Sequence, residues 1–250
     1  MTLLGGKIVV VTAAAGTGIG SAVAARCLEE GASVVLSDWH ERRLGETFDK
    51  LAAEHPGRVH ALACDVTVED QVRALIDGAT DHFGRIDVMV NNAGLGGDRS
   101  ILEMSDADWA RVLDVTLNGT FRCTRAALRR MVDQGGGGAV VNNASVVGWR
   151  AQRGQAHYAA AKAGVMALTR CAAMDVAAHG IRVNAVAPSL AMHPFLAKVS
   201  SEELLAELAS REAFGRAAEP REVANVIVFL ASDLAGYLTG EVISVSSQHP

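Results

Sequence analysis

Short runs of consecutive apolar residues alternate along the chain with longer segments in which apolar residues recur every three or four positions. The runs are rich in β-branched residues and lack a polar face, which is typical of strands buried on both sides. The longer segments have the spacing of amphipathic helices. We predict strands at 7–13, 32–38, 58–65, 86–94, 139–144, 181–188 and 241–245, and helices at 21–30, 68–82, 106–131, 158–179 and 220–231.

Capping signals mark the starts of several predicted helices. Ser105 with Asp108 predicts the start of the long helix, and Thr67 with Asp70 predicts the start of the helix at 68–82. Strands and helices alternate without a repeat or an interdomain linker. The predicted fold class is therefore α/β: one domain over 1–250 with a Rossmann-type, doubly wound, seven-stranded, mainly parallel sheet and helices on both faces.

Glycines gather between the first strand and the first helix. Gly16, Gly18 and Gly20 let backbone N–H groups and the helix N-terminus approach a pyrophosphate. The spacing departs from G-x-G-x-x-G, since Ser21 occupies the last position, and a plain tight turn explains the cluster equally well. Doubly wound sheets bind ligands beyond the carboxyl ends of their strands, so this turn is a candidate dinucleotide contact.

Carboxylates and small residues end the next three strands. Asp38 ends the second strand, where a carboxylate accepts both hydroxyls of an adenosine ribose and repels a 2′-phosphate, so NAD is favoured over NADP. Arg42 and Arg43 keep NADP open, although a solvated helix face also explains them. Asp65 either accepts a hydrogen bond from adenine or caps the following helix. The Asn-Asn-Ala-Gly run at 91–94 either lies against the cofactor or is an Asn-rich turn.

A hydroxyl, a phenol and an ammonium follow the fifth strand. Tyr158 and Lys162 are four residues apart and share one face of a helix, and Ser145 lies at the end of the strand before it. The lysine charge is expected to lower the pKa of the phenol, so that it exchanges a proton with an alcohol or a carbonyl whose oxygen the serine holds. Chance placement is the alternative interpretation of this stretch taken alone.

Composition and charge argue against several other classes. The chain has 250 residues and a net charge of −5 without a basic stripe, which argues against nucleic acid as a partner. Its four cysteines and eight histidines are dispersed without metal-ligand spacing, so no metal is expected, and reduced thiols fit a cytoplasmic protein. No apolar run is long enough to span a membrane, and the first residues lack the form of a signal peptide.

In this order, the motifs resemble those of the short-chain dehydrogenase/reductase family over nearly the whole chain. The matching positions are 16–20, 65–66, 91–94, 145, 158, 162, 182–188 and 239–240. The resemblance is strongest to 3-oxoacyl-(acyl-carrier-protein) reductases and their relatives. It implies hydride transfer between a nicotinamide and a substrate carbon, and a homotetramer in which helices 106–131 and 158–179 pair between subunits.

The resemblance also implies roles for individual residues. Tyr158 would be the catalytic acid/base, Ser145 would hold the reacting oxygen, and Lys162 would hold the nicotinamide ribose and lower the tyrosine pKa. The implied NAD-binding residues are Gly16, Thr17, Gly18, Ile19, Gly20, Asp38, Asp65, Val66, Asn92, Ala93, Gly94, Tyr158, Lys162 and Pro188.

Two departures from the family pattern affect the turn and the catalytic group. Ala13 and Ala14 stand where the family has threonine and glycine, so the turn is expected to be one residue longer. Thr116 stands where the family has a catalytic asparagine. Asn118 lies two residues further on, about 200° around a regular helix, so it cannot simply substitute.

Two further departures indicate a reshaped substrate side. His193 replaces the usual threonine in the segment that begins at Ser189, and Val-Ser-Ser-Gln at 245–248 replaces a usual D-G-G ending. We expect a substrate-lid insertion at about 189–214, although an ordinary packed helix is the alternative. The residues that predict it are Phe195, Leu196, Leu204, Leu205 and Leu208 at near-helical spacing, with Ser200 and Glu203 as a capping box.

Together these features predict an oxidoreductase. It would transfer a hydride between NAD(H) and a hydrophobic secondary alcohol or ketone, of the acyl thioester or sterol-derived type. One alternative is an NADPH-dependent 3-oxoacyl-carrier reductase. Another, from a different class, is a catalytically silent dinucleotide-binding protein.

Overall fold

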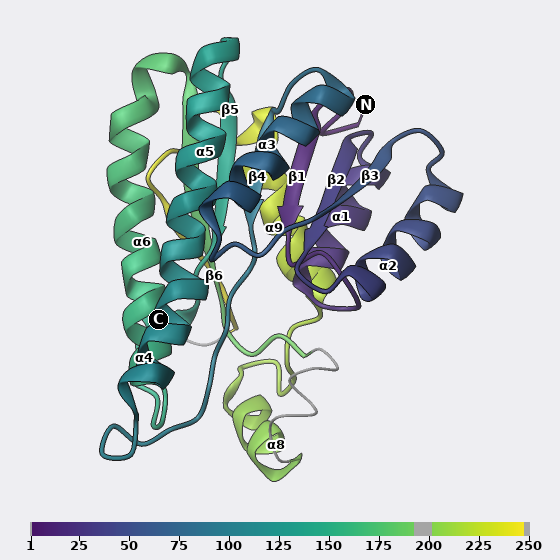
Figure 1. Ribbon diagram of the computed structural model, residues 1–250. Helices are drawn as coiled ribbons and strands as arrows, with labels where there is room; N and C mark the ends of the chain where they lie inside the picture. The colour runs from purple at the N-terminus through teal and green to yellow at the C-terminus, as the bar shows by residue number, and fades with distance from the viewer. Residues whose placement is uncertain (1, 193–201, 248–250) are drawn as a thin grey trace.

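Seven parallel strands form one sheet in the computed structural model, which describes residues 2–192 and 202–247 (Figure 1). The strand order is β3-β2-β1-β4-β5-β6-β7, and every neighbouring pair is parallel. The order reverses between β1 and β4, where doubly wound sheets bind their ligands. The strands are β1 (Ile8–Thr12), β2 (Ser33–Asp38), β3 (Val59–Ala63), β4 (Val88–Asn91), β5 (Gly138–Asn143), β6 (Ile181–Pro188) and β7 (Val242–Val245). The predicted fold class is confirmed.

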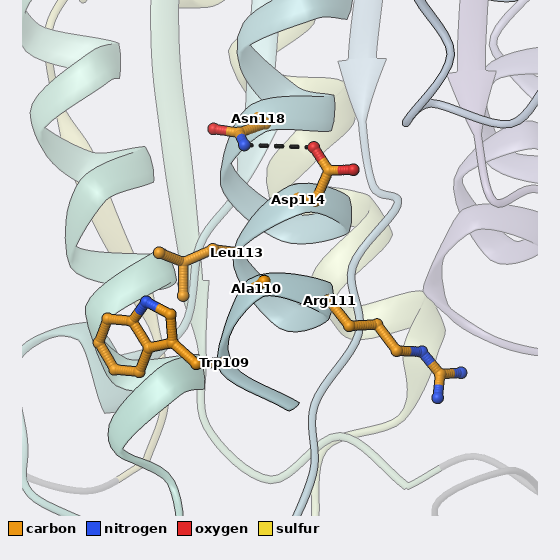
Figure 2. Close-up of a pocket in the computed structure, with 6 residues that line it drawn as sticks. All are labelled: Trp109, Ala110, Arg111, Leu113, Asp114 and Asn118. Carbon is orange, nitrogen blue, oxygen red and sulfur yellow. Dashed lines mark hydrogen bonds between the residues drawn. The ribbon is translucent and has the colours of Figure 1, made fainter. Parts of the chain in front are cut away.

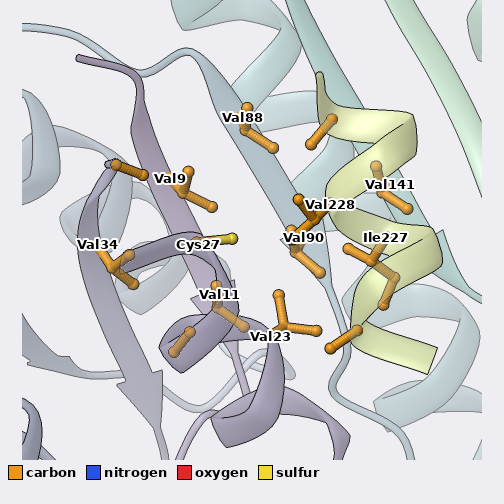
Figure 3. Close-up of a cluster of buried hydrophobic side chains, with 14 of the residues drawn as sticks. Val9, Val11, Val23, Cys27, Val34, Val88, Val90, Val141, Ile227 and Val228 are labelled. Atoms are coloured by element: carbon orange, nitrogen blue, oxygen red, sulfur yellow. The ribbon is translucent and has the colours of Figure 1, made fainter. Parts of the chain in front are cut away.

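Helices cover both faces of the sheet, which is why its strands are apolar on both sides. Val9 and Val11 of β1 pack with α1 and α9 on one face, as Figure 3 shows, whereas Val10 belongs to the core on the face of α3, α5 and α6. Alternate side chains of one strand thus enter opposite layers. The helices are α1 (Ile19–Glu29), α2 (Glu41–Glu54), α3 (Glu69–Phe83), α4 (Asp106–Leu113), α5 (Gly119–Gln134), α6 (Ala156–Val176), α8 (Glu202–Arg211) and α9 (Pro220–Ala231).

Capping at the helix starts follows the sequence in one case and differs in another. Ser105 and Asp108 form the predicted capping box of α4. The predicted cap of α3 by Thr67 and Asp70 is wrong: Val68 is the N-cap residue and makes no side-chain cap. The Thr67 hydroxyl instead donates to the Asp65 carboxylate at 2.8 Å. A capping hydroxyl accepts from an N–H of the first helical turn, and no such bond to Thr67 forms among the described residues.

The helix predicted at 106–131 contains an interruption. Residues Asp114–Asn118 form a π-helical turn, η1, between α4 and α5. Such turns rotate the side chains of the flanking helix relative to a regular α-helix and are frequent at functional sites. α2 has no counterpart among the predicted ranges, because Leu44 and Leu51 are its only fully buried residues.

The segment expected as a lid is described in part. Figure 1 places α8 beyond the carboxyl ends of the strands, apart from the layers that cover the sheet. Leu205 of α8 is buried, and Ala191 forms an isolated bridge with Ala218. His193, Phe195, Leu196 and Ser200 lie outside the described residues, as do the side chains of Glu203 and Leu204. Within the described ranges, no helix combines the length and the apolar character needed to cross a membrane.

Candidate active site

The three predicted catalytic residues meet at the carboxyl end of β5. Ser145 lies two residues after β5, and its hydroxyl donates to the Pro188 carbonyl at the end of β6, at 3.5 Å. Tyr158 and Lys162 lie one turn apart in the first half of α6. A hydrogen bond joins the Ser145 and Tyr158 side chains. Loop residue, phenol and ammonium therefore face one site, as their spacing predicts.

Electrostatics at Tyr158 differ from the sequence-based expectation. Burial raises the pKa of the Tyr158 phenol, and the hydrogen bond with Ser145 lowers it by less. Burial also lowers the pKa of Lys162 to about 8. The Lys162 ammonium lies 5.5 Å from the centre of the phenol ring and donates to the Asn143 carbonyl at 2.5 Å. The expected lowering of the tyrosine pKa is wrong for this arrangement, since desolvation outweighs the hydrogen bond with Ser145.

Thr116 takes the position left by the usual asparagine. Its side chain is fully buried in η1, and its hydroxyl accepts from Leu95 N at 2.9 Å and donates to Leu95 O at 3.0 Å. A Cβ atom on Gly94 would lie 3.4 Å from Lys162 Nζ and 3.8 Å from Thr116 Oγ1, so both side chains border Gly94. Thr116 thereby holds the loop that passes next to Lys162.

Asn118 does not replace the usual asparagine. It is exposed, and its side chain donates to the Asp114 carboxylate at 3.2 Å, as Figure 2 shows. Thr116, two residues earlier, is buried against Leu95. Of these two residues, Thr116 alone faces the site among the contacts that the structure describes.

The glycine turn has room for a phosphate group. A Cβ atom on Gly16 or Gly18 would meet nothing within 4 Å, whereas a Cβ atom on Gly20 would lie 2.2 Å from Ala13 O. Ala13 has a positive φ of 49°, which accommodates the longer turn. The first N–H groups of α1, which starts at Ile19, have no acceptor within the helix. An open cradle beside free N–H groups fits the pyrophosphate of a dinucleotide.

Asp38 and Asp65 are both held by neighbouring backbone. The Asp38 side chain is 7 % exposed, and its two oxygens accept from Ala15 N at 3.3 Å and from His40 N at 2.9 Å. Asp65 accepts from Thr67 N at 2.9 Å in the turn before α3, so its carboxylate does not cap the helix that follows Val68. Asp38 thus links the glycine turn to the end of β2, where an adenosine ribose would lie.

Two threonines complete the cofactor side and are missing from the predicted set. The Thr12 hydroxyl accepts from Asn92 N at 3.0 Å and from Ala93 N at 3.1 Å, which fixes the end of β4 against β1. The Thr47 hydroxyl of α2 accepts from Gly16 N at 3.0 Å. The position of Thr12 at the end of β1 could have indicated its role from the sequence. Thr47 lies 31 residues from its partner Gly16, and no local pattern indicates their contact.

The remaining predicted contacts sit around this edge. Asn92 accepts from the Asn143 side chain and donates to the carbonyls of residues 12 and 13. Val66 is buried, and a Cβ atom on Gly119 would lie 2.6 Å from it, so it packs under the start of α5. Pro188 ends β6 next to Ser145. His157 is a further buried residue, and its Nδ1 accepts from Tyr158 N at 2.9 Å.

Comparisons with known proteins span nearly the whole chain. A family model described as enoyl-(acyl carrier protein) reductase matches residues 13–247. The chain is 65% identical over 248 residues to a (5R,7aS)-5-hydroxy-7a-methyl-1-oxo-2,3,5,6,7,7a-hexahydro-1H-indene-carboxyl-CoA reductase of Mycobacterium tuberculosis, covering 99% of this chain and 95% of the relative. It is 40% identical over 242 residues to a 3-oxoacyl-(acyl-carrier-protein) reductase of Thermotoga maritima, covering 97% of each. The crystal structure of a short chain dehydrogenase from Mycobacterium smegmatis has a TM-score of 0.89 and 57% identity, covering 100% of this chain and 95% of that chain.

Proposed function

The chain belongs to the short-chain dehydrogenase/reductase family, and from that premise we propose that it interconverts a ring-borne secondary alcohol and its ketone on a hydrophobic acyl thioester, with NAD(H) as hydride carrier. Family membership makes it an oxidoreductase that acts on CH–OH groups with a nicotinamide dinucleotide. The observation that carries the reaction is the meeting of Ser145, Tyr158 and Lys162 at the end of β5. The ring and the thioester rest on the 65% identical indene-carboxyl-CoA reductase.

Proton transfer in this mechanism belongs to Tyr158. Its raised pKa keeps the phenol protonated at neutral pH, so it donates to a carbonyl oxygen in the reductive direction. Ser145 holds the same oxygen with its hydroxyl. The nearby Lys162 ammonium stabilises the phenolate that is left behind. A bound nicotinamide supplies or accepts the hydride.

The choice of NAD over NADP rests on Asp38. Its carboxylate ends β2 at the adenosine side and would repel a 2′-phosphate. Arg42 is exposed and paired with Glu46, which supports its interpretation as a solvated helix face. Arg43 Nε is buried without a hydrogen bond to any described residue, and this observation favours NADPH as the alternative.

A substrate panel separates the proposed function from its alternatives. We expect turnover with NADH of bicyclic 3-oxoacyl-CoA thioesters, and at least about tenfold lower kcat/KM with straight-chain 3-oxoacyl thioesters. Preference for the straight chain with NADPH would favour the 3-oxoacyl-carrier reductase. Tight NADH binding without any turnover would favour the silent dinucleotide-binding protein.

The variant Tyr158→Phe tests the mechanism itself. It removes the proton donor and keeps the ring, so we expect turnover to fall by at least about 100-fold while the Kd for NADH stays within about threefold. Stopped-flow fluorescence and steady-state kinetics measure the two. Retained turnover would contradict the assignment of the acid.

We propose a homotetramer as the working assembly. A groove of about 510 Å³ runs along α4 and η1 (Figure 2), and apolar side chains stay exposed on α4 and α5, including Trp109 at 38 % and Phe121 at 42 %. Pairing of these helices between subunits would cover them. Light scattering at micromolar concentration tests this, and a monomer would contradict it.

Two further expectations remain proposals. We treat 1–250 as one dinucleotide-binding domain, with the segment at about 189–214 as a substrate-side insertion. We also propose the cytoplasm as its location, because all four cysteines are free, which suits a reducing compartment. Small hydrophobic molecules are the proposed partners, and neither nucleic acid nor a membrane is.

A further inference from the structure

A cavity of about 290 Å³ lies between the ends of β6 and β7, the end of α8 and the start of α9. Residues from both segments that depart from the family pattern on the substrate side line this cavity. Ser189 follows Pro188 where the family has glycine, and Ser247 belongs to the segment that replaces the D-G-G ending. The lining residues that matter here are Ser189, Glu212, Arg216, Glu222, Ser244 and Ser247.

Three buried polar atoms in this lining lack a partner. Glu212 is 4 % exposed, and its Oε2 accepts from Ser247 N at 3.3 Å and from Ser247 Oγ at 2.8 Å. Glu212 Oε1, Ser189 Oγ and Ser244 Oγ make no hydrogen bond to any residue that the structure describes. Buried polar atoms normally have partners, so three around one cavity indicate a ligand that supplies them.

The cavity lies next to the reacting group. Ser145 Oγ donates to Pro188 O, and the following residue, Ser189, donates its N–H to Val245 O at 3.2 Å. Ser244 sits opposite Ala187 in the β6–β7 register, one strand further from β5. Two consecutive residues, Pro188 and Ser189, therefore connect the Ser145 hydroxyl to the cavity.

The size of the cavity and the hydrogen-bonding groups in its lining favour an organic group with a hydroxyl or a carbonyl. At the rim of the cavity, Arg216 and Glu222 form a bidentate ion pair with both contacts at 2.7 Å, so their charges neutralise one another. The volume exceeds the roughly 30 Å³ of a water molecule about tenfold. Serine hydroxyls donate to a carbonyl oxygen, and the free Glu212 oxygen accepts from a hydroxyl.

We propose that this cavity binds a second, uncharged oxygen substituent of the substrate, a ring carbonyl or hydroxyl on a carbon remote from the reacting one. This inference rests on the proposed function and specifies its substrate class. Ser189, Ser244 and Glu212 are then specificity-determining residues. A ring without that oxygen leaves all three of their polar atoms unpaired, which a site built for hydrogen bonding discriminates against.

The experiment uses the full chain and three bicyclic 3-oxoacyl-CoA thioesters that differ at one remote ring carbon, which carries a ketone, a hydroxyl or hydrogen only. We expect the wild type to prefer either oxygenated thioester by at least about tenfold in kcat/KM over the one without oxygen. Ser189→Ala and Ser244→Ala should each reduce that ratio severalfold or more. Glu212→Gln should raise the ketone-to-hydroxyl ratio, because the amide can donate where the carboxylate only accepts.

A matched control and the contrary outcomes complete the design. Ser210→Ala removes an exposed hydroxyl of α8 that donates to Glu207 O, and it should leave the ratio unchanged. Equal turnover of all three thioesters by the wild type, or a ratio untouched in both serine variants, overturns this inference alone. Failure of the wild type to turn over any of the three overturns the proposed function and the inference with it. Ser189 and Ser244 lie on different elements, so one variant tests the idea if the other does not fold.

Discussion

Replacing Thr116 by valine removes one hydroxyl and keeps the shape of the side chain. That hydroxyl makes two hydrogen bonds to the backbone of Leu95, at 2.9 and 3.0 Å. Thr116 is fully buried and Leu95 is partly buried, so water can take over these bonds only in part. Each neutral hydrogen bond contributes about 1 kcal/mol, so the variant should release the loop after β4 by about 2 kcal/mol.

This free energy sets the expected size of the effect. A change of about 2 kcal/mol shifts the fraction of anchored loop about 30-fold. Gly94 of this loop borders Lys162 Nζ, so a released loop no longer fixes the lysine beside Tyr158. We therefore expect kcat/KM to fall by up to about 30-fold and the free energy of unfolding to fall by about 2 kcal/mol.

Denaturant unfolding and steady-state kinetics measure the two effects. Thr116→Ser is the matched variant: it keeps the hydroxyl and loses one methyl group, so it should retain most of the activity at a stability cost of about 1 kcal/mol. Wild-type kinetics in Thr116→Val would refute the reasoning. Equal damage in both variants would also refute it, since packing and not the hydroxyl would then hold the loop.

Three further predictions concern charge and close packing. Burial lowers the pKa of Lys162 from 10.5 to about 8, so the unfolded chain binds more protons between these pH values, and the stability that Lys162 contributes should rise by about 3 kcal/mol across that window. Urea unfolding between pH 7 and 9.5 should show a smaller rise in stability for Lys162→Met than for the wild type, and parallel profiles would contradict this. Asp38→Ala should reduce the ratio of NADPH Kd to NADH Kd by about tenfold or more, measured by fluorescence titration, and an unchanged ratio would remove Asp38 as the discriminating residue. Gly20→Ala places a Cβ atom 2.2 Å from Ala13 O and should destabilise the fold by about 2 kcal/mol, whereas Gly45→Ala, which meets nothing within 4 Å, should not destabilise it; equal melting temperatures would contradict the close approach.

The sheet and the positions of the site residues follow from local signals in the sequence. Continuous apolar runs mark strands covered on both faces, and residues at their ends necessarily gather at one edge of a parallel sheet. For that reason Ser145, Tyr158 and Lys162 can be placed together without coordinates. Helix capping is less secure, because only the folded loop decides whether the Thr67 oxygen meets a first-turn N–H, and here the hydroxyl donates to Asp65 outside the helix.

Features that depend on distant partners could not be predicted. The Tyr158 pKa depends on how much solvent the folded chain excludes, and spacing alone does not report that. The π-helical turn at Asp114–Asn118 has no periodic signature, yet it carries Thr116, which is buried against Leu95, while Asn118 is exposed. Thr47 reaches Gly16 from another helix.

The departures from the family pattern fall into two physical groups. Near strands β1 to β5, other contacts or backbone conformations accommodate the departures. Ala13 adopts a positive φ that accommodates the longer turn, and Thr116 holds the loop beside Lys162 through hydrogen bonds. At the β6–β7 edge one departure is not compensated within the described residues, since Ser189 leaves its hydroxyl unpaired. An uncompensated buried hydroxyl destabilises a protein unless something binds to it. Ser145 and the departures at the β6–β7 edge therefore lie on neighbouring strands, with Pro188 as the residue that joins them.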